Sequence, residues 1–446
     1  MKTNRSTRAA WAWLKHNATL MTAGGTWSEQ LPGHIRGNLR WFFFDGLFAA
    51  AHDAITLTYI PLYILALGAT DAQIGLMASL ASLSATVMLI PGAMLSDRLS
   101  KRKPIILFGG GGMTRFFVLL LGLTPFVLAG PSAVYVAITF KVLADGFANL
   151  SFPAWTSMTG DVVPIAWRGR YFGTRNIIMG VSNMVAILLL GLLITHSASP
   201  LGYQFAFIIA ALAGWSSTFS YAHIREAPKV PAPLDVRAYT PAGLWSSLKA
   251  DPNFAVFCLF NGLWNFSLNI AGPFFNIYLV QDLHATAAMV GVTTLVASLT
   301  SLPAQRWFGQ LNDRWGPRRI QLLTGFLIPA LPLAWIFTTA AWHTIPIQIA
   351  SGVLWAGFNL ASFNFLLNLA PPEQRARFSA LNQVAIALSS AVGAALGGVI
   401  AGQFGYHAVF LLSGVGRILS MVVFIRFVHQ PISEIIAEKK QSGLSK

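Results

Sequence analysis

Long apolar runs separated by short polar segments set the strongest limit on how this 446-residue chain folds. A helix needs about 20 apolar residues to cross a hydrocarbon core of about 30 Å, where it satisfies its own backbone hydrogen bonds. The runs lie at 41–65, 73–96, 105–129, 133–159, 173–196 and 202–222, and at 253–280, 286–309, 320–340, 345–369, 377–401 and 407–427. Only 10% of the residues are charged, against about a quarter in soluble proteins. We therefore predict an all-α membrane protein with twelve transmembrane helices.

An internal repeat relates the first six runs to the last six. Residues 44–98 align without a gap to residues 260–314, and 14 of the 55 aligned pairs are identical. Shared hydrophobicity does not account for the identical Asp, Arg, Gly and Thr residues among them. The repeat predicts two pseudo-symmetric six-helix bundles. We place them at 41–222 and 253–428, with tails over 1–40 and 429–446 and a linker over 223–252.

The net charge of +15 follows the expected membrane topology. With both termini inside, 27 of the 30 Lys and Arg residues fall in the tails, the inner loops or the adjoining helix ends, and the outer loops hold none. This is the positive-inside pattern, so the basic charge indicates orientation and does not indicate a nucleic-acid partner. We expect a multi-pass protein of the plasma membrane with cytoplasmic termini. Arg115, Lys141 and Arg417 lie within spans, and we expect the two arginines to pair inward or to snorkel rather than to bind a ligand.

Two inner loops carry the most specific motif in the chain. Residues 309–319 read G-Q-L-N-D-R-W-G-P-R-R and resemble the G-x-x-x-D-R-x-G-R-[RK] loop of the major facilitator superfamily. The first copy keeps Asp97 and Arg98 but has Ala93 and Ser100 at two glycine positions. The resemblance implies secondary transport by alternating access, with helices 1, 4, 7 and 10 around a central cavity.

The loop after the fourth helix of each half also resembles an element of this superfamily. It reads R-G-R at 168–170 and R-A-R at 375–377. The resemblance implies that the inner loops gate the cavity, whereas the simpler interpretation is a solvated turn. The expected gating residues are Asp97, Arg98, Arg168, Arg170, Asp313, Arg314, Arg375 and Arg377.

Ionisable side chains inside the spans are costly in a bilayer, so each is a candidate functional group. The proton-coupling candidates are Asp45, His52, Asp53, Lys141 and Asp145. Lys141 and Asp145 are one turn apart on the fourth helix, and Asp53 lies near the middle of the first. We expect the carboxyl groups, with His52, to take up and release a proton while Lys141 shifts their pKa values. The alternative is that Lys141 pairs with Asp145 or Asp53 only to hold helix 1 against helix 4.

The repeat replaces these titratable groups with neutral ones in the second half. Asp45 aligns with Asn261, and Asp53 aligns with Asn269. Amides and indoles spaced along a helix offer directed hydrogen bonds and an apolar stacking face, which suits a polar neutral or zwitterionic ligand. The alternative is hydrogen bonding between helices. The expected substrate-binding residues are Asn149, Asn261, Trp264, Asn265, Asn269, Trp355, Asn359 and Ser362.

The sequence favours a transporter over an enzyme. It has one cysteine, no metal-ligand spacing of histidines and no Gly-Lys-Ser/Thr after its glycine run at 109–112, so we expect no catalytic residue, metal or cofactor. The favoured function is proton-coupled transport of a small polar solute, sugar-like or amino-acid-like, through a monomer; the sequence does not distinguish protons from sodium as the coupling ion. Proton-driven efflux of amphipathic compounds is the alternative, which Phe152, Trp155, Phe274 and Phe275 favour. A non-transporting receptor or a membrane-embedded enzyme is a third hypothesis.

Overall fold

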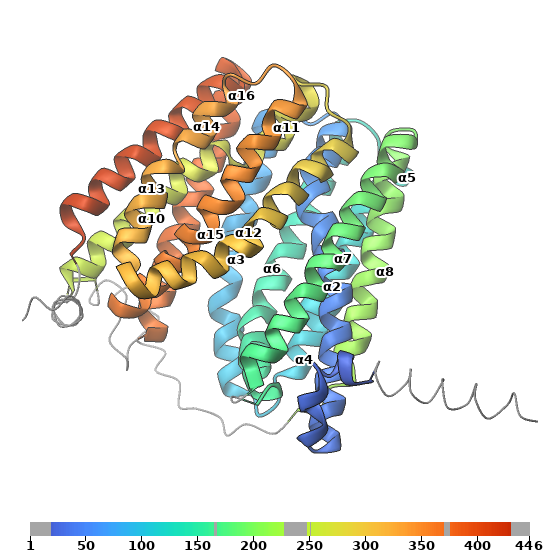
Figure 1. Ribbon diagram of the computed structural model, residues 1–446. Coiled ribbons are helices and arrows are strands. Elements are labelled where there is room, and N and C mark those ends of the chain that lie inside the picture. The colour runs from blue at the N-terminus through green and yellow to red at the C-terminus, as the bar shows by residue number, and fades with distance from the viewer. Residues whose placement is uncertain (1–18, 165–166, 227–247, 250, 370–374, 430–446) are drawn as a thin grey trace, which may run out of the picture. The chain divides into compact units, whose positions relative to one another are not determined.

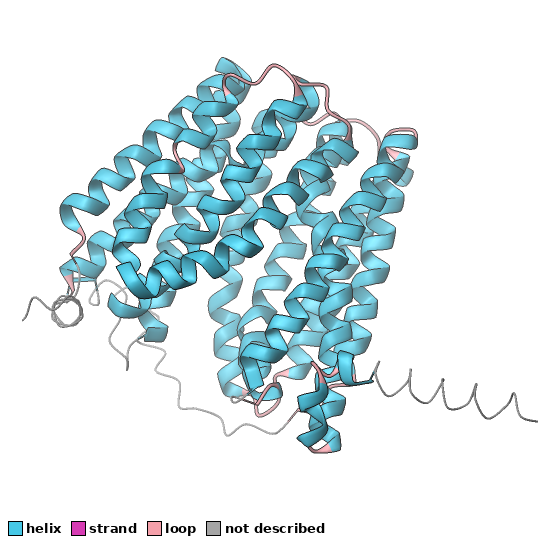
Figure 2. Ribbon diagram, in the orientation of Figure 1, coloured by secondary structure: helices cyan, strands magenta, loops and turns pink. Residues whose placement is uncertain are grey.

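The computed structural model describes residues 19–164, 167–226, 248–249, 251–369 and 375–429. Across these ranges the regular elements are helices (Figure 2), which confirms the predicted all-α class. In the first half they are α2 (Gly33–Ala66), α3 (Asp71–Arg98), α4 (Lys103–Ile106), α5 (Thr114–Val127), α6 (Pro131–Val162), α7 (Arg168–His196) and α8 (Leu201–Ala222). In the second half they are α10 (Pro252–Ala271), α11 (Phe275–Gln281), α12 (Ala287–Trp315), α13 (Pro317–Leu327), α14 (Ala330–Trp335), α15 (Thr344–Leu369) and α16 (Arg375–Phe427) (Figure 1).

The described residues include ten helical segments that are long and apolar enough to span a bilayer. The last of these covers 47 residues of α16, or about 70 Å at 1.5 Å per residue, enough for two crossings. It is interrupted at Gly405, whose φ of 75° lets the chain turn without a separate loop. The ninth predicted span is covered by α13 and α14, which are separated at Ile328 and Pro329. Most residues of the predicted spans are helical in the described part of the chain, and residues 336–340, at the end of the ninth span, are among the exceptions.

The helices form two compact units. The first unit comprises residues 1–63 and 87–234, and the second comprises residues 64–86 and 235–446. Helix α3 therefore contributes its first part to the second unit and its last part to the first. The predicted linker and C-terminal tail lie largely outside the described residues, whereas residues 19–40 of the predicted N-terminal tail are described and include the start of α2 at Gly33.

Buried tyrosines anchor α2 within the first unit. The hydroxyl of Tyr59 donates a hydrogen bond to a backbone carbonyl of α7, and that of Tyr63 donates to one of α5, both at 2.9 Å. At the other end of the helix, Tyr171 of α7 donates to the carbonyl of Leu39 at 2.7 Å. Because a bilayer offers no hydrophobic drive for helix association, such polar contacts help fix the position of a helix. They tie α2, which carries three of the titratable candidates, to α5 and α7.

The second unit is built around an aromatic core and close helix contacts. The Trp264 ring of α10 stacks on Phe358 of α15, with ring centroids 4.5 Å apart. Gly393 and Gly397 of α16 face backbone carbonyls of α10, and a Cβ at either position would collide with them. Small residues at such contacts allow helix backbones to approach closely in a membrane.

The beginning of α3 packs within the second unit. The hydroxyl of Tyr406 donates to the Asp71 carboxylate at 2.7 Å and also contacts the side-chain oxygen of Gln281. One turn further along α3, Gly75 lies against Gly398 of α16, where an added Cβ would be 2.8 Å from the facing Cα. This stretch of α3 is held by backbone proximity and by one polar cluster at its end.

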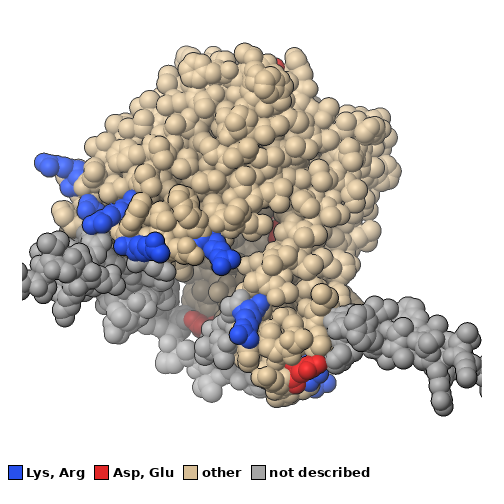
Figure 3. Space-filling model, viewed as in Figure 1, with Lys and Arg blue, Asp and Glu red and all other residues tan. Residues whose placement is uncertain are grey.

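Basic side chains collect near one end of the helices. On the face drawn in Figure 3, Lys and Arg lie along the lower edge, and the surface above them is mostly made of other residues. Arg98 and Arg314, at the ends of α3 and α12, are both exposed.

Candidate functional site

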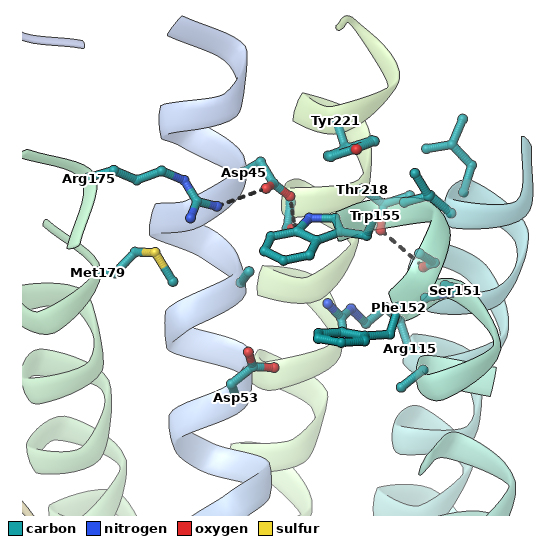
Figure 4. A pocket seen from close by; sticks show the side chains of 17 residues that line it. Asp45, Asp53, Arg115, Ser151, Phe152, Trp155, Arg175, Met179, Thr218 and Tyr221 are labelled. Carbon is teal, nitrogen blue, oxygen red and sulfur yellow. Dashed lines mark hydrogen bonds and ion pairs between the residues drawn. The ribbon is translucent and has the colours of Figure 1, made fainter. Parts of the chain in front are cut away.

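The first unit contains a cavity of about 310 Å³. Its walls come from α2, α5, α6, α7 and α8 and from the π-helical segment Leu107–Met113 that joins α4 to α5. Charged groups from three helices reach it, together with hydroxyls of α6 and α8 and two aromatic rings of α6 (Figure 4). These side chains are Asp45, Asp53, Arg115, Arg175, Ser151, Ser217, Thr218, Phe152 and Trp155.

The glycine run at 109–112 forms part of this wall. A Cβ at Gly111 would lie 2.5 Å from Thr218 of α8, and one at Gly109 would collide with Ser151 of α6. The N–H of Gly110 donates to the Ser151 hydroxyl at 2.6 Å. The glycines therefore serve close packing, and they bring a π-helical turn, a feature often found at functional sites, to the cavity.

Asp45 is held in a buried ion pair. Its Oδ2 accepts a hydrogen bond from the Arg175 guanidinium of α7 at 3.2 Å, and its Oδ1 accepts one from the Ser217 hydroxyl of α8 at 2.7 Å. The side chains of Asp45 and Arg175 are 8% and 5% exposed. Gly46 makes room for the pair, because a Cβ there would lie 2.7 Å from the guanidinium. Asp45 thus ties α2 to α7 and α8.

Asp53 is in a different environment two turns along α2. Its side chain is exposed to the cavity, and its carboxylate makes no hydrogen bond or ion pair with any other described residue. Arg115 of α5 lines the same cavity and interacts electrostatically with both Asp53 and Asp45 (Figure 4). Arg115 fits because Gly214 of α8 has no side chain; a Cβ there would be 2.5 Å from the arginine. This site can hold a proton without an ion pair being broken.

Lys141 pairs with Asp145 on its own helix. The ammonium group lies 2.6 Å from both carboxylate oxygens, and the two side chains are 16% and 28% exposed. Of the two partners considered from the sequence, Asp145 is the one in contact, although Lys141 also acts electrostatically on Asp53. His52 is buried, and its Nδ1 hydrogen-bonds with the carbonyl of Ala210 at 2.8 Å.

The asparagines of α10 mostly bond to neighbouring helices and to their own helix. Asn261 donates to the Asn382 side chain of α16 at 2.9 Å, and Asn269 donates to the Ser390 hydroxyl at 2.9 Å. Asn265 donates to the backbone carbonyl of Asn261 at 2.9 Å. In the first unit, Asn149 makes the same kind of bond, to the carbonyl of Asp145.

The remaining substrate candidates lie in three different environments. Trp264 lies in the aromatic core and is 2% exposed. Trp355 and Asn359, one turn apart on α15, line a second cavity of about 480 Å³ within the second unit. Ser362 has a buried hydroxyl without a hydrogen-bond partner among the described residues. Within the second unit, Trp264 is thus packed in the core, whereas Trp355 and Asn359 share a cavity lining.

The gating candidates lie at helix ends. Arg170 is exposed and its guanidinium lies over the Trp167 ring, 5.1 Å from the centroid. Asp97 and Arg98 end α3, and Arg314 lies near the end of α12. The side chains of Arg168, Asp313, Arg375 and Arg377 lie outside the described part of the structure.

Two buried arginines of the first unit were missed by the sequence reasoning. Arg175 counts among the basic residues at helix ends in the positive-inside pattern, yet extending the Arg168–Arg375 alignment by seven residues pairs it with Asn382. The repeat therefore matches the Asp45–Arg175 contact with Asn261–Asn382, and this was the signal available. Arg102, before α4, is 1% exposed.

Arg102 joins three segments of the first unit. It bonds to Asp161 at 2.7 Å, to Glu226 at 3.1 Å and to the Ser157 hydroxyl at 2.7 Å. Burial opposes its charge, but hydrogen bonds to the two acids raise the pKa of Arg102 above its ordinary value. The cluster fixes the end of α6 to the segments that precede α4 and follow α8.

The Major Facilitator Superfamily model matches residues 42–269 and 263–445, nearly the whole chain. The chain belongs to the Major Facilitator Superfamily. It is 26% identical over 393 residues to the multi-drug resistance efflux pump PmrA of Streptococcus pneumoniae, which covers 84% of this chain and 92% of that protein. It is 25% identical over 367 residues to a putative sugar efflux transporter of Deinococcus radiodurans, covering 77% and 86%.

Solved transporters have the same fold. A mutant of the nucleoside transporter NupG superposes with a TM-score of 0.71 at 13% identity, covering 87% of this chain and 99% of that one. A bacterial homologue of the iron transporter ferroportin, in an inward-facing state, gives 0.68 at 17% identity, covering 87% and 98%. This member of the superfamily is a multi-pass membrane transporter, and the predicted fold and family are confirmed.

Proposed function

We propose that this transporter couples the movement of a small polar solute to the movement of protons, by alternating access. The observation that carries the proposal is Asp53, a cavity-lining carboxylate without an ion pair or hydrogen bond among the described residues. Asp45 and Asp145 are each held by a basic side chain. An acid in a membrane cavity that lacks such a partner is the group most easily protonated and deprotonated without dismantling the helix bundle.

Protonation of Asp53 changes how far the charge of Arg115 is compensated. When Asp53 is ionised, its charge compensates the guanidinium that faces the same cavity. When Asp53 takes up a proton, Arg115 loses part of that compensation, and the cavity becomes more attractive to a polar or negatively charged group of a solute. Proton binding and solute binding are then linked through one electrostatic interaction.

The solute itself is proposed to be small, like a sugar or an amino acid. Support comes from the hydroxyls of Ser151, Ser217 and Thr218 in the first cavity and from Asn359 in the second. Coupling by sodium instead of protons would leave these contacts unchanged and is separated from the proton proposal by the experiment below.

Proton-driven efflux of amphipathic compounds is the second candidate. A relative across most of the chain is named a multi-drug efflux pump. Phe152 and Trp155 line the first cavity with rings 6.2 Å apart, and aromatic walls suit flat apolar compounds. Phe275 contributes to the second cavity.

We further propose the orientation and the gate that the sequence indicates. The exposed basic residues at helix ends support cytoplasmic termini in the plasma membrane. Asp97 and Arg98, with their repeats Asp313 and Arg314, would then act at the inner ends of α3 and α12 as the gating loops. The two bundles at 41–222 and 253–428 would be the moving parts.

The test is the internal pH of proteoliposomes during addition of a sugar, an amino acid or a lipophilic cation. The native protein and the control Asp282→Asn, an exposed acid outside the spans, should both give a solute-dependent pH change. Asp53→Asn should abolish that change. If solute accumulates without a pH change in the native protein, proton coupling is wrong; if Asp53→Asn retains the pH change, Asp53 is not the coupling group.

A further inference from the structure

Arg417, on the last membrane segment of α16, is a buried cation without a counter-ion. Its side chain is 2% exposed. Its Nε and Nη2 atoms have no hydrogen-bond partner, and no carboxylate among the described residues pairs with it. The sequence predicts that this arginine pairs inward or snorkels, but no acid among the described residues pairs with it and it is almost fully buried.

In the described part of the chain, the two other buried arginines and the half-buried Arg115 have acids beside them. Arg102 bonds to two acids, and Arg175 bonds to Asp45. Arg115 lies near both Asp45 and Asp53. A guanidinium without such a partner is strongly disfavoured in a low-dielectric interior, so the surroundings of Arg417 lack one negative group that the other three sites contain.

Arg417 is among the residues that line the cavity of about 480 Å³ in the second unit. This is within the range of small-molecule sites. Amide and hydroxyl groups of Asn276, Gln348, Ser351 and Asn359 share the lining with Arg417, and the rest is mainly apolar and aromatic, including Trp335 and Trp355. The lining thus combines one positively charged residue with polar side chains and aromatic rings.

We propose that this cavity binds the carboxylate of a small organic anion, with Arg417 as the anion-binding residue. A guanidinium donates two parallel hydrogen bonds to a carboxylate, a two-pronged geometry that a single ammonium cannot reproduce. The neighbouring amides satisfy further polar groups of the solute, and the rings of Trp335 and Trp355 contact its apolar body. The inference rests on the proposed transport function for its purpose, since it names the class of solute, but binding itself does not depend on proton coupling.

The cavity size favours a free solute over a membrane lipid, which presents the same anionic oxygens on a much larger body. An amino-acid-like metabolite carries the required carboxylate, whereas a neutral sugar does not. The inference therefore narrows the proposed solutes to those with an acid group.

Benzoate and benzamide test the proposal, because they share a ring and differ in charge. The full-length protein in a neutral detergent is heated with each compound, and the unfolding temperature is followed by tryptophan fluorescence. A ligand that binds only the folded state raises that temperature. Benzoate should raise it and benzamide should not, in the native protein and in the control Arg426→Gln, an exposed arginine of the same helix.

Arg417→Gln should weaken benzoate binding by about tenfold to a hundredfold, the usual effect of removing a charge-assisted contact. Without ligand, this variant should unfold at the same or a higher temperature than the native protein, because it removes an uncompensated buried charge. Arg417→Lys, which keeps the charge but loses the two-pronged geometry, should fall between the two. A markedly lower unfolding temperature of ligand-free Arg417→Gln would reveal a structural partner and overturn the proposal.

Equal shifts with benzoate and benzamide, or an unchanged benzoate shift in Arg417→Gln, would also overturn it. So would stabilisation that depends on Arg417 but comes only from added phosphatidylglycerol, because the occupant would then be a lipid headgroup. Benzoate binding that persists in Asp53→Asn keeps this inference distinct from proton coupling. Loss of proton coupling would not contradict anion binding at Arg417, and loss of anion binding would not contradict proton coupling through Asp53.

Discussion

Exchanging the Asp45–Arg175 pair for the amides of its repeat partner gives a quantitative test of how the first unit is held together. The second unit has Asn261 and Asn382 at the equivalent positions, 2.9 Å apart. The variants are Asp45→Asn, Arg175→Asn and the double variant, which reproduces the amide pair in the first unit.

The expected energies follow from burial. Both side chains of the pair are at most 8% exposed, so either single substitution leaves one buried charge unpaired and should cost about 3–5 kcal/mol of unfolding free energy. The double variant leaves no such charge. It loses the contact of the Arg175 guanidinium with the Phe42 ring, 4.1 Å from the centroid, so it should cost only about 1–3 kcal/mol. The coupling energy is then at least about 3 kcal/mol.

Reversible unfolding in detergent micelles, followed by tryptophan fluorescence, measures all three costs. Exposed Arg98→Asn is the control and should change the unfolding free energy by less than about 0.5 kcal/mol. If the two single costs add to the double cost within about 0.5 kcal/mol, the residues do not act as a pair. Transport that survives in the double variant would also make Asp45 a structural residue and leave proton coupling to Asp53.

Three further substitutions test the packing described above. Gly46→Ala should lower the unfolding free energy by about 1–3 kcal/mol, because its Cβ would lie 2.7 Å from a buried guanidinium. The control Gly173→Ala, with open space around it, should be neutral or stabilising. Equal effects in the two variants would contradict the clash. Trp264→Ala should lower the unfolding free energy by about 3–5 kcal/mol, because the ring is in the core. The KM of the transporter that remains folded should not change. A raised KM with full stability would instead place this ring at the substrate. Glu226→Gln should lower the unfolding free energy by about 1.5–3 kcal/mol, because it removes a charged partner of Arg102. The same unfolding curves measure this loss. No loss of stability would show that Asp161 alone suffices to compensate Arg102.

The fold was largely predictable because the bilayer imposes helix length and the chain repeats itself. The roles of individual polar residues were less so. Trp264 and Trp355 are both on helices expected to line the cavity, yet one is in the core and the other at a cavity. In a membrane helix the lipid-facing and core-facing sides are equally apolar, so hydrophobic periodicity does not separate them. The helix rotation that does so is set by packing contacts such as the stacking of Trp264 on Phe358.

The ion-pair partners could not be deduced for a similar reason. The sequence alone indicates no ion-pair partner for Asp45, because its partner, Arg175, is 130 positions away. The repeat contained that information in the Arg175–Asn382 correspondence. Arg417 has no such trace, since only the packed structure reveals whether a buried cation has a carboxylate beside it.

The contact of α3 with α16 joins two kinds of surface with different mechanical properties. At Gly75 and Gly398 the backbones touch directly, and no side chain is inserted into a hole on the opposite helix. Because glycine has no side-chain rotamers, the two helices can move past or away from each other at this point without a change of side-chain conformation. The Tyr406 hydrogen bonds to Asp71 and Gln281, at the end of the same contact, are directional and exchangeable with water. The contact therefore combines a close approach of two backbones, without rotamers to rearrange, with polar interactions that water can replace.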